Sequence, residues 1–409
     1  MKIWLINHYA VPPQYYPLAR PSLFAKNLIK MGHNVTIIAA STVHNSESEN
    51  LIKSKEKVKK IIDDGIPYVL INCTPYQGNG LNRVRNILDF SKNLPKVLDM
   101  LEKPDVIVST TFDPFTCYAG IKYARKYGIT AIAEIADLWP EVLIVYNKMN
   151  LKNPLIRYLR NIEKKIYTQA DRVVFTAAGE YEYIIEQGWE KELPKSKFGY
   201  INNGIDIELF DYNKEHFITP DPDLENDELF KVVYTGSIRK VNNVGGILEV
   251  AKNITDKRIK FLIWGGGDEL NSLKKRSEDE NIHNVVFKGK VEKKYIPYIT
   301  SKADLNYAHN QPSPMFKYGI SFNKIFDYLA AGKPILCDFK CNYNPVLMGN
   351  AGLSVDSANP HDIAVQIEKF VDMDRIEYEA FCEAARNTAK EYDFKILTEK
   401  LVNIIDDCR

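Results

Sequence analysis

A loop, a helix, a glycine turn and a strand follow one another in residues 319–336, which read Gly-Ile-Ser-Phe-Asn-Lys-Ile-Phe-Asp-Tyr-Leu-Ala-Ala-Gly-Lys-Pro-Ile-Leu. Apolar residues at helical spacing predict a helix that begins at Asn323. Gly332 is placed to take the left-handed conformation that ends a helix, and Pro334 prevents its continuation. The apolar pair that follows predicts a buried strand.

The start of this helix is a predicted anion site. A helix N-terminus presents unpaired N–H groups and a partial positive charge. Lys324 adds a full charge in the first turn, where the dipole disfavours a cation, and an anionic ligand would remove that conflict. Asp327 lies on the same side of the helix and can accept hydrogen bonds from hydroxyls. Phosphate with sugar hydroxyls is the combination that a nucleotide-sugar offers.

The composition is that of a large enzyme with about two domains. Of 409 residues, 45% are hydrophobic and 26% charged, which is enough to bury a sizeable core. A net charge of +1 gives no support for nucleic-acid binding. We expect a cytoplasmic protein, because no signal peptide or membrane span is visible and the scattered cysteines indicate buried thiols rather than disulfides or a zinc site.

Short apolar runs alternate with longer helical patterns, a βαβ rhythm typical of parallel sheets covered on both faces. We expect strands at 2–7, 34–39, 67–72, 105–109, 130–135, 172–176 and 198–201, then at 231–236, 259–264, 284–287, 304–307 and 334–337. We expect helices at 19–31, 90–102, 114–127, 153–169 and 179–187, then at 244–253, 268–279 and 323–331.

Two doubly wound, Rossmann-like α/β domains are therefore predicted, at residues 1–210 and 226–390, facing each other across a cleft. Residues 207–230 are polar and contain prolines, which is typical of a linker. A last helix at about 392–409 is a candidate to pack back on the first domain. The basic run 53–60 indicates a solvated loop or helix face.

Two turns in the second half suit phosphate chemistry. One carries Gly236, Ser237, Arg239 and Lys240 at the end of a strand, and its alternative interpretation is an ordinary surface turn. The other is the glycine run 265–267, which would let the backbone approach a ligand closely. No G-x-G-x-x-G follows the first strand, which argues against a nicotinamide dehydrogenase.

These motifs together resemble the GT-B glycosyltransferases of retaining family 4, and the resemblance runs nearly end to end. In the second half, a strand-ending glycine, a glycine-rich turn and an acidic helix followed by Gly-Lys-Pro occur in the family's order. In the first half, segments 171–176 and 202–206 are similar to family segments. Residues 137–141 and 76–90 further resemble a bacterial subgroup that includes the L-fucosamine transferases of surface-polysaccharide assembly.

The chain departs from the family at both ends of the donor site. The family's E-x7-E pair would fall on Gly319 and Asp327, so the first carboxylate is absent and backbone N–H groups of 319–322 or another side chain must replace it. The family's phosphate-binding Arg and Lys would fall on Ser237 and Asn242. We expect a nearby cation to substitute, with Lys324 favoured over Arg239 and Lys240.

The resemblance implies that sugar is transferred with retention, without a metal or a cofactor, as charge builds on the departing diphosphate. Catalytic roles are expected for Lys324, Arg239 and Asp137. The base should lie near Lys290 and Val291, and Asp327 should hold the ribose. The full set of expected donor contacts is Gly236, Ser237, Lys240, Gly265, Gly266, Lys290, Val291, Gly319, Ile320, Ser321, Asn323 and Asp327.

The acceptor side is expected in the first domain. Asp137 matches a family position that faces the acceptor, and its alternative role is a helix N-cap. The loop from Tyr9 to Arg20 carries Tyr15 and Tyr16 as stacking surfaces and Arg20 as a candidate phosphate ligand. His8 is more simply a structural residue at a strand end than a base.

A helix over 152–167 is amphipathic and basic, which fits either peripheral membrane contact at the inner face of the cell membrane or a core-packing helix with a charged outer face. The favoured function is a hexosyl- or acetamidosugar transferase acting on a saccharide or lipid-linked acceptor, and the subgroup favours UDP. The alternatives are a sugar-nucleotide epimerase, a phosphorylase or a non-catalytic sugar-nucleotide binding protein.

Overall fold

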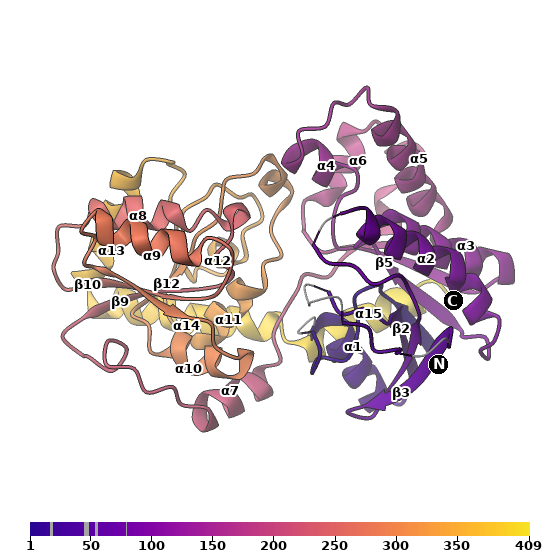
Figure 1. Ribbon diagram of the computed structural model, residues 1–409, viewed down its shortest axis with the longest axis horizontal. Coiled ribbons are helices and arrows are strands. Elements are labelled where there is room, and N and C mark those ends of the chain that lie inside the picture. Colours follow the sequence, from indigo (N-terminus) through magenta and orange to yellow (C-terminus); the bar gives the residue numbers. More distant parts are fainter. Residues whose placement is uncertain (17–18, 45–48, 54–55, 79) are drawn as a thin grey trace. The chain divides into compact units, whose positions relative to one another are not determined.

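A computed structural model describes residues 1–16, 19–44, 49–53, 56–78 and 80–409. The chain divides into two compact units. Unit 1 contains Met1–Asn202 together with Leu397–Arg409, and unit 2 contains Asn203–Ile396. Both labelled ends of the chain therefore lie in unit 1 (Figure 1).

Unit 1 is built, over its described residues, on an eight-stranded sheet of order β3-β4-β2-β1-β5-β6-β7-β8, in which only β3 runs antiparallel to its neighbour. The strands are β1 (Lys2–Ile6), β2 (Asn34–Ala40), β3 (Val58–Asp63), β4 (Ile66–Ile71), β5 (Val106–Thr110), β6 (Thr130–Ile135), β7 (Arg172–Phe175) and β8 (Phe198–Tyr200). The helices are α1 (Ala19–Lys30), α2 (Leu81–Leu98), α3 (Pro114–Tyr127), α4 (Glu141–Tyr146), α5 (Pro154–Gln169), α6 (Glu180–Glu186) and α15 (Phe394–Asp406), with the short 3₁₀ turn η1 (Lys195–Lys197).

Unit 2 is built on a six-stranded parallel sheet of order β11-β10-β9-β12-β13-β14. The strands are β9 (Phe230–Thr235), β10 (Ile259–Trp264), β11 (Val285–Gly289), β12 (Leu305–Ala308), β13 (Ile335–Cys337) and β14 (Gly352–Ser354). The helices are α7 (Ile207–His216), α8 (Gly245–Lys252), α9 (Leu270–Asp279), α10 (Ile296–Ser301), α11 (Asn323–Ala331), α12 (Pro345–Met348), α13 (Pro360–Val371) and α14 (Arg375–Glu391), with 3₁₀ turns η2 (Lys240–Asn242), η3 (Lys293–Tyr295) and η4 (Pro314–Tyr318).

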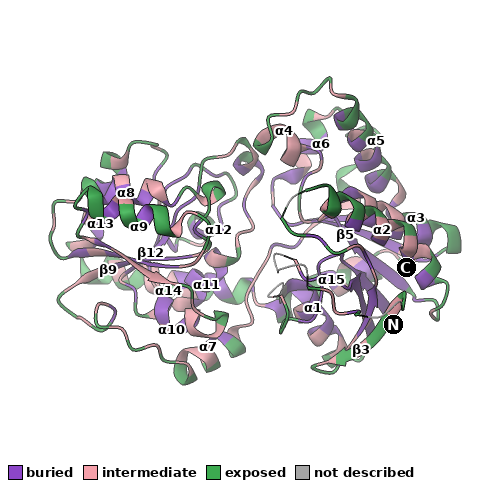
Figure 2. Cartoon of the chain, in the orientation of Figure 1, coloured by how far each residue is buried: buried purple, intermediate pink, exposed green. Residues whose placement is uncertain are grey.

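Helices cover both faces of the unit 2 sheet. Figure 1 shows α8, α9 and α13 on one face and α10, α11 and α14 on the other. Because helices cover both faces of the sheet, every residue of β12 and β13 is buried (Figure 2). The predicted pair of doubly wound α/β folds is confirmed, because strands too apolar for a wet face need a helix layer on each side.

Three expectations for individual elements were wrong. The basic run 53–60 leads into β3, an edge strand whose exposed lysines discourage pairing with another chain (Figure 2). The expected linker 207–230 contains α7, which is capped by the Asp206 side chain (3.0 Å to the Leu209 N–H) and buries little besides Phe210. Helix α2 begins at Leu81 rather than 90, and its first turns carry exposed apolar residues that hide the helical period.

Helix α15 is the helix expected near 392–409, and from Leu397 onward it packs within unit 1. A Cβ on Gly199 of β8 would come within 2.8 Å of the Ile404 side chain. The Arg172 guanidinium donates to the Asp407 carbonyl at 3.4 Å. Residues 397–409 thus pack against β7 and β8 of the unit 1 sheet.

Candidate nucleotide-binding site

Three strand ends of unit 2 are locked together by their backbones at the carboxyl edge of the sheet. The Gly236 N–H donates to the Trp264 carbonyl (3.0 Å), and the Gly265 N–H donates to the Gly289 carbonyl (2.8 Å). A Cβ on Gly265 would lie 1.8 Å from the Gly236 carbonyl oxygen, and a Cβ on Gly267 would lie 2.1 Å from the Ile238 oxygen. These two glycines therefore allow one turn to approach another closely.

The turn after β9 presents two cations to solvent. Arg239 and Lys240 are exposed, and the exposed Ser237 accepts from the Asn242 side-chain amide at both its carbonyl and its hydroxyl oxygen (2.6 Å each). Asn243 closes the turn in the left-handed conformation (φ +50°). Internal hydrogen bonds thus fix the backbone of this turn, while its two long cationic side chains remain available to an anion.

The loop before α11 explains why glycine stands at position 319. Its φ is +106°, a backbone conformation that side-chain-bearing residues rarely adopt. Ser321 is held by Asn203, which donates from its N–H to the Ser321 hydroxyl (3.0 Å) and from its amide to the Ser321 carbonyl (2.8 Å). Phe322 is the N-cap of α11 and makes no side-chain capping bond, so the helix start keeps donors for a ligand.

Lys324 is half-buried in the first turn of α11 and points at neutral oxygens. Its ammonium donates to the His309 carbonyl (3.1 Å) and the Tyr234 hydroxyl (3.3 Å) and lies 4.5 Å from the centre of the Tyr234 ring. Desolvation lowers the pKa of Lys324 to about 8, against the opposing charge of Asp338. The predicted conflict between cation and helix dipole is therefore real, and these contacts fix the ammonium without cancelling its charge.

Asp327 lies one turn further along α11 and is 3% exposed. Its carboxylate forms a close ion pair with the ammonium of Lys293, a residue that the sequence did not single out. Lys293 follows β11 in the same loop as Lys290 and Val291, the expected position of the base. This pair joins the base side of the candidate site to α11.

The remaining expected donor residues occupy the same sheet edge. Gly266 is half-buried, and a Cβ there would lie 3.4 Å from the Lys290 side chain. Ile320 is buried, so only its backbone can serve a ligand, whereas Asn323 is exposed. Tyr234, Lys293, His309 and Asp338 were missed. Asp338 directly follows the predicted strand 334–337 and His309 lies two residues after the predicted strand 304–307, which was a usable signal, whereas Tyr234 lies inside a strand and gave none.

The acceptor-side residues of unit 1 have mixed surroundings. Asp137 follows β6 and is exposed, and its alternative role as a helix N-cap is wrong because α4 begins at Glu141 with Pro140 as its N-cap. Tyr15 is exposed, while Tyr16 packs edge-on against the His44 ring. These placements leave Asp137 and Tyr15 as accessible candidates at the carboxyl edge of the unit 1 sheet.

Arg20 does not have the surroundings expected of a phosphate ligand. It is 8% exposed, and its guanidinium donates to Glu134 (2.9 Å) and to the carbonyls of Ile201 (2.9 Å) and Asn202 (2.6 Å). These bonds tie the end of β6 to the chain after β8. We therefore assign Arg20 a structural role.

His8 has the structural role that the sequence favoured. Its ring is buried at the end of β1, where its two nitrogens lie 3.2 Å from the Asp113 carboxylate and 2.7 Å from the Asn86 amide oxygen. The ring is also stacked against Tyr9 and Phe90.

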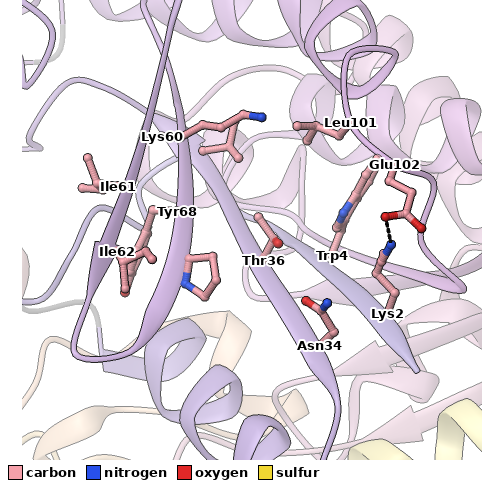
Figure 3. Close-up of a pocket in the computed structure, with 12 residues that line it drawn as sticks. Lys2, Trp4, Asn34, Thr36, Lys60, Ile61, Ile62, Tyr68, Leu101 and Glu102 are labelled. Carbon is pink, nitrogen blue, oxygen red and sulfur yellow. Dashed lines mark ion pairs between the residues drawn. The ribbon is translucent and has the colours of Figure 1, made fainter.

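A hollow of about 510 Å³ lies at the opposite end of the unit 1 sheet (Figure 3). Trp4, Thr36 and Lys60 line it, beside the ion pair between Lys2 and Glu102 (2.6 Å). Ligands of doubly wound sheets bind beyond the carboxyl ends of the strands, whereas this hollow lies at the amino ends of β1 and β2. It contains none of the expected site residues.

Two searches of the described residues bear on metals and membranes. They hold no group of three or more His, Cys, Asp or Glu side chains that could bind a metal ion. In that same part of the chain, no helix has both the length and the apolar character needed to cross a bilayer. The six cysteines are free thiols, and four of them are buried.

Two doubly wound units, one carrying a cationic turn beside an uncapped helix start, define the GT-B architecture. Similar solved structures include sucrose-phosphate synthase from Thermosynechococcus elongatus (TM-score 0.73, 15% identity, 100% of this chain and 98% of that chain covered). Anabaena HepE in complex with UDP is also similar (TM-score 0.67, 13% identity, 100% of both chains covered). A third similar structure is WaaG, a glycosyltransferase involved in lipopolysaccharide biosynthesis (TM-score 0.65, 13% identity, 98% of this chain and 99% of that chain covered).

Comparison of the amino-acid sequence with family models shows the family. The model for Glycosyltransferase Family 4 matches residues 23–209, and that for Glycosyl transferases group 1 matches residues 218–388. The chain therefore belongs to the family 4, group 1 glycosyltransferases. Two curated relatives, the putative teichuronic acid biosynthesis glycosyltransferase TuaH of Bacillus subtilis and the uncharacterized glycosyltransferase MJ1069 of Methanocaldococcus jannaschii, are each 24% identical, over 66% and 60% of this chain. The matches span just under two thirds of those relatives, 65% and 62%.

Replacing Gly265 with Ala should destabilise the protein by about 1–3 kcal/mol, because the added methyl group meets a backbone oxygen that cannot move without disturbing the turn. Gly266→Ala is the matched control, since its methyl group meets only the flexible Lys290 side chain, and it should change stability by under about 0.5 kcal/mol. Urea unfolding followed by tryptophan fluorescence measures both. Equal stability of the two variants would contradict the turn-to-turn contact.

The affinity for UDP should fall as the pH rises through about 8, because Lys324 is charged below that pH and neutral above it. The phosphates of UDP are already fully ionised there, so their titration does not contribute. Isothermal titration calorimetry between pH 6.5 and 9.5 gives the profile. In Lys324→Met the decline should disappear, and a decline of the same size in that variant would assign it to another group.

Proposed function

We propose that this protein is a retaining glycosyltransferase that moves a sugar from a nucleoside-diphosphate donor to a saccharide or lipid-linked saccharide acceptor. The observation that carries the proposal is the position of Lys324, which holds its charge at an uncapped helix start on the same sheet edge as Arg239 and Lys240. Three cations and open N–H groups on one edge suit a diphosphate. Membership of family 4, group 1 supports the same reaction class.

UDP is the proposed nucleotide. Structures of HepE with UDP and with UDP-glucose have a similar fold, and the resemblance to the L-fucosamine-transferase subgroup favours the same base. The loop of Lys290 and Val291 would receive the base, and Asp327 would accept from the ribose hydroxyls. Because Lys293 already pairs with Asp327, ribose binding would share or replace that ion pair.

Different residues would act on the leaving group, the transferred sugar and the acceptor. As the bond from the anomeric carbon to the diphosphate breaks, negative charge grows on the β-phosphate and the sugar becomes oxocarbenium-like. Lys324 and Arg239 would stabilise that charge, and the N–H groups at the start of α11 would add their dipoles. Asp137 in unit 1 would face the acceptor. Gly319 has no carboxylate where the family has its first Glu, so the transferred sugar would rely on the backbone N–H groups of 319–322 or on another side chain.

The acceptor is proposed to belong to bacterial surface polysaccharide synthesis. The relatives support this assignment: TuaH is named for teichuronic acid biosynthesis, and WaaG for lipopolysaccharide biosynthesis. Such acceptors are made at the inner face of the cell membrane, which is where we place the protein.

Lys324→Ala should lower kcat/KM by a factor that corresponds to about 2–4 kcal/mol of transition-state stabilisation, because a buried charged contact to the leaving group is lost. Lys275→Ala, an exposed lysine of α9, is the control and should leave the rate unchanged. The assay is sugar transfer or donor hydrolysis with a panel of UDP-sugars. A decrease in kcat/KM below tenfold for Lys324→Ala would indicate that Arg239 or Lys240 stabilises the leaving group instead.

One competing function rests on a specific observation. The missing Glu at position 319 makes a non-catalytic sugar-nucleotide binding protein conceivable, and the positive φ of Gly319 shows that the backbone is built around its absence. Tight UDP-sugar binding without transfer or hydrolysis, across the panel, would favour this function. Turnover of any donor would exclude it, and formation of an isomerised or phosphorolysed sugar would identify an epimerase or a phosphorylase.

A second proposal concerns the membrane. Leu155 and Tyr158 are about half exposed on α5 (46% and 56%), next to the exposed cations Lys152 and Arg157. Apolar residues flanked by cations suit the surface of an anionic bilayer. This face supports the membrane interpretation of the helix over the purely core-packing one.

The double variant Leu155→Ser/Tyr158→Ser should lower co-sedimentation with vesicles that contain anionic phospholipid by several-fold. The control is Ile376→Ser, which changes a still more exposed apolar residue (79%) in unit 2. Binding of the parent protein should rise with the anionic fraction and fall with salt. Binding that does not depend on the anionic lipid fraction would exclude this face of α5 as the membrane contact.

A further inference from the structure

His309 and Asp338 form a buried pair at the carboxyl edge of the unit 2 sheet. Each is the first residue after a strand, and because Ala308 of β12 and Cys337 of β13 are paired in register, the two side chains emerge next to each other. They are 5% and 6% exposed. His309 Nδ1 makes a close contact with Asp338 Oδ2, which also accepts from the Tyr307 hydroxyl at 2.6 Å.

The other nitrogen of His309 holds the cationic turn. His309 Nε2 lies 2.6 Å from the carbonyl oxygen of Asn243, and because a carbonyl can only accept, the nitrogen donates. A Cβ on Gly246 would lie 2.9 Å from the His309 ring, so the ring is tightly confined. The left-handed end of the turn is thereby fixed to the sheet through a side chain.

The backbone of His309 holds Lys324. Its carbonyl accepts from the Lys324 ammonium at 3.1 Å, and the same ammonium donates to the Tyr234 hydroxyl, which donates in turn to the Ser237 carbonyl (3.3 Å each). A closed circuit results, in which Lys324 reaches one end of the turn through Tyr234 and the other end through His309. No other described residue is bonded to both Lys324 and Asn243 in this circuit.

We propose that His309, oriented by Asp338, is a positioning residue that sets the spacing between Lys324 and the cationic turn 237–243 so that both grip one diphosphate. The proposal rests on the proposed function. His309 touches no reacting atom: it acts through Lys324 and through the turn. Asp338 fixes the ring orientation with one oxygen, while its other oxygen, Oδ1, is buried without a hydrogen-bond partner among the described residues.

The pair also bears on the charge of Lys324. The groups that face the Lys324 ammonium are Tyr234 from β9, Cys337 and Asp338 at the end of β13, and the His309 carbonyl after β12. The charge of Asp338 raises the pKa of Lys324 against the larger effect of burial. Removing that charge while keeping the side chain's size should let Lys324 lose its proton at a lower pH.

The experiment measures binding of UDP and of inorganic pyrophosphate to the full chain by calorimetry, from pH 6.5 to 9.5. His309→Ala should weaken both ligands by at least about tenfold, and His309→Gln, which keeps an N–H donor near Asn243, should recover most of the loss. Asp338→Asn should move the pH midpoint of binding below that of the parent. His283→Ala, an exposed histidine of the same unit, is the control and should match the parent.

The outcomes test the proposed function and the positioning role of His309 and Asp338 separately. Failure of the parent protein to bind UDP or pyrophosphate would overturn the proposed function itself. If the parent binds, and the His309 and Asp338 variants lose thermal stability but keep the parent's affinity and pH midpoint, the pair is merely structural and the inference is wrong. Should His309→Ala fail to fold, Asp338→Asn still decides, since parental affinity for both ligands together with an unmoved midpoint in that variant would overturn the positioning role.

Discussion

The contact on which the donor site depends is one of backbone against backbone. The turn after β9 lies so close to the turn after β10 that the carbonyl oxygen of Gly236 occupies the space of a side chain on Gly265. Hydrogen bonds to Trp264 and Gly289 continue the arrangement across three neighbouring strands. Only glycine permits this spacing, which brings the turn with Arg239 close to the turn after β10 and to the end of β11.

Charge is placed at this edge with little compensation. Lys324 contacts a carbonyl, a hydroxyl and the face of an aromatic ring, all of which fix an ammonium without neutralising it. Burial then weakens the proton affinity of Lys324. A site built in this way gains most from a ligand that brings its own negative charge, which is why we propose a diphosphate rather than a neutral sugar as its ligand.

Much of the fold could be predicted from the sequence, because parallel strands buried on both faces are almost wholly apolar and stand out from the helices between them. Elements with little buried surface were not predicted: β3 is an exposed edge strand, and α7 buries little besides Phe210. The turn after β9 and the start of α11 were singled out from local chemistry, and their role in binding phosphate stays a prediction. The Lys293–Asp327 and His309–Asp338 pairs were not predicted, since each joins residues on different strands or loops and depends on strand order, which the sequence alone does not state.

The division of the chain into units has a consequence for its synthesis. Unit 2 is continuous, from Asn203 to Ile396, whereas unit 1 also includes Leu397–Arg409, which pack against β7 and β8. A nascent chain therefore has every residue of unit 2 before it has all of unit 1, although unit 1 was begun first. During that interval Gly199 lacks the Ile404 side chain that packs on it, so the surface of β8 that α15 covers is exposed to other chains. Helix α15 thus completes a unit whose strands are all synthesised before those of unit 2.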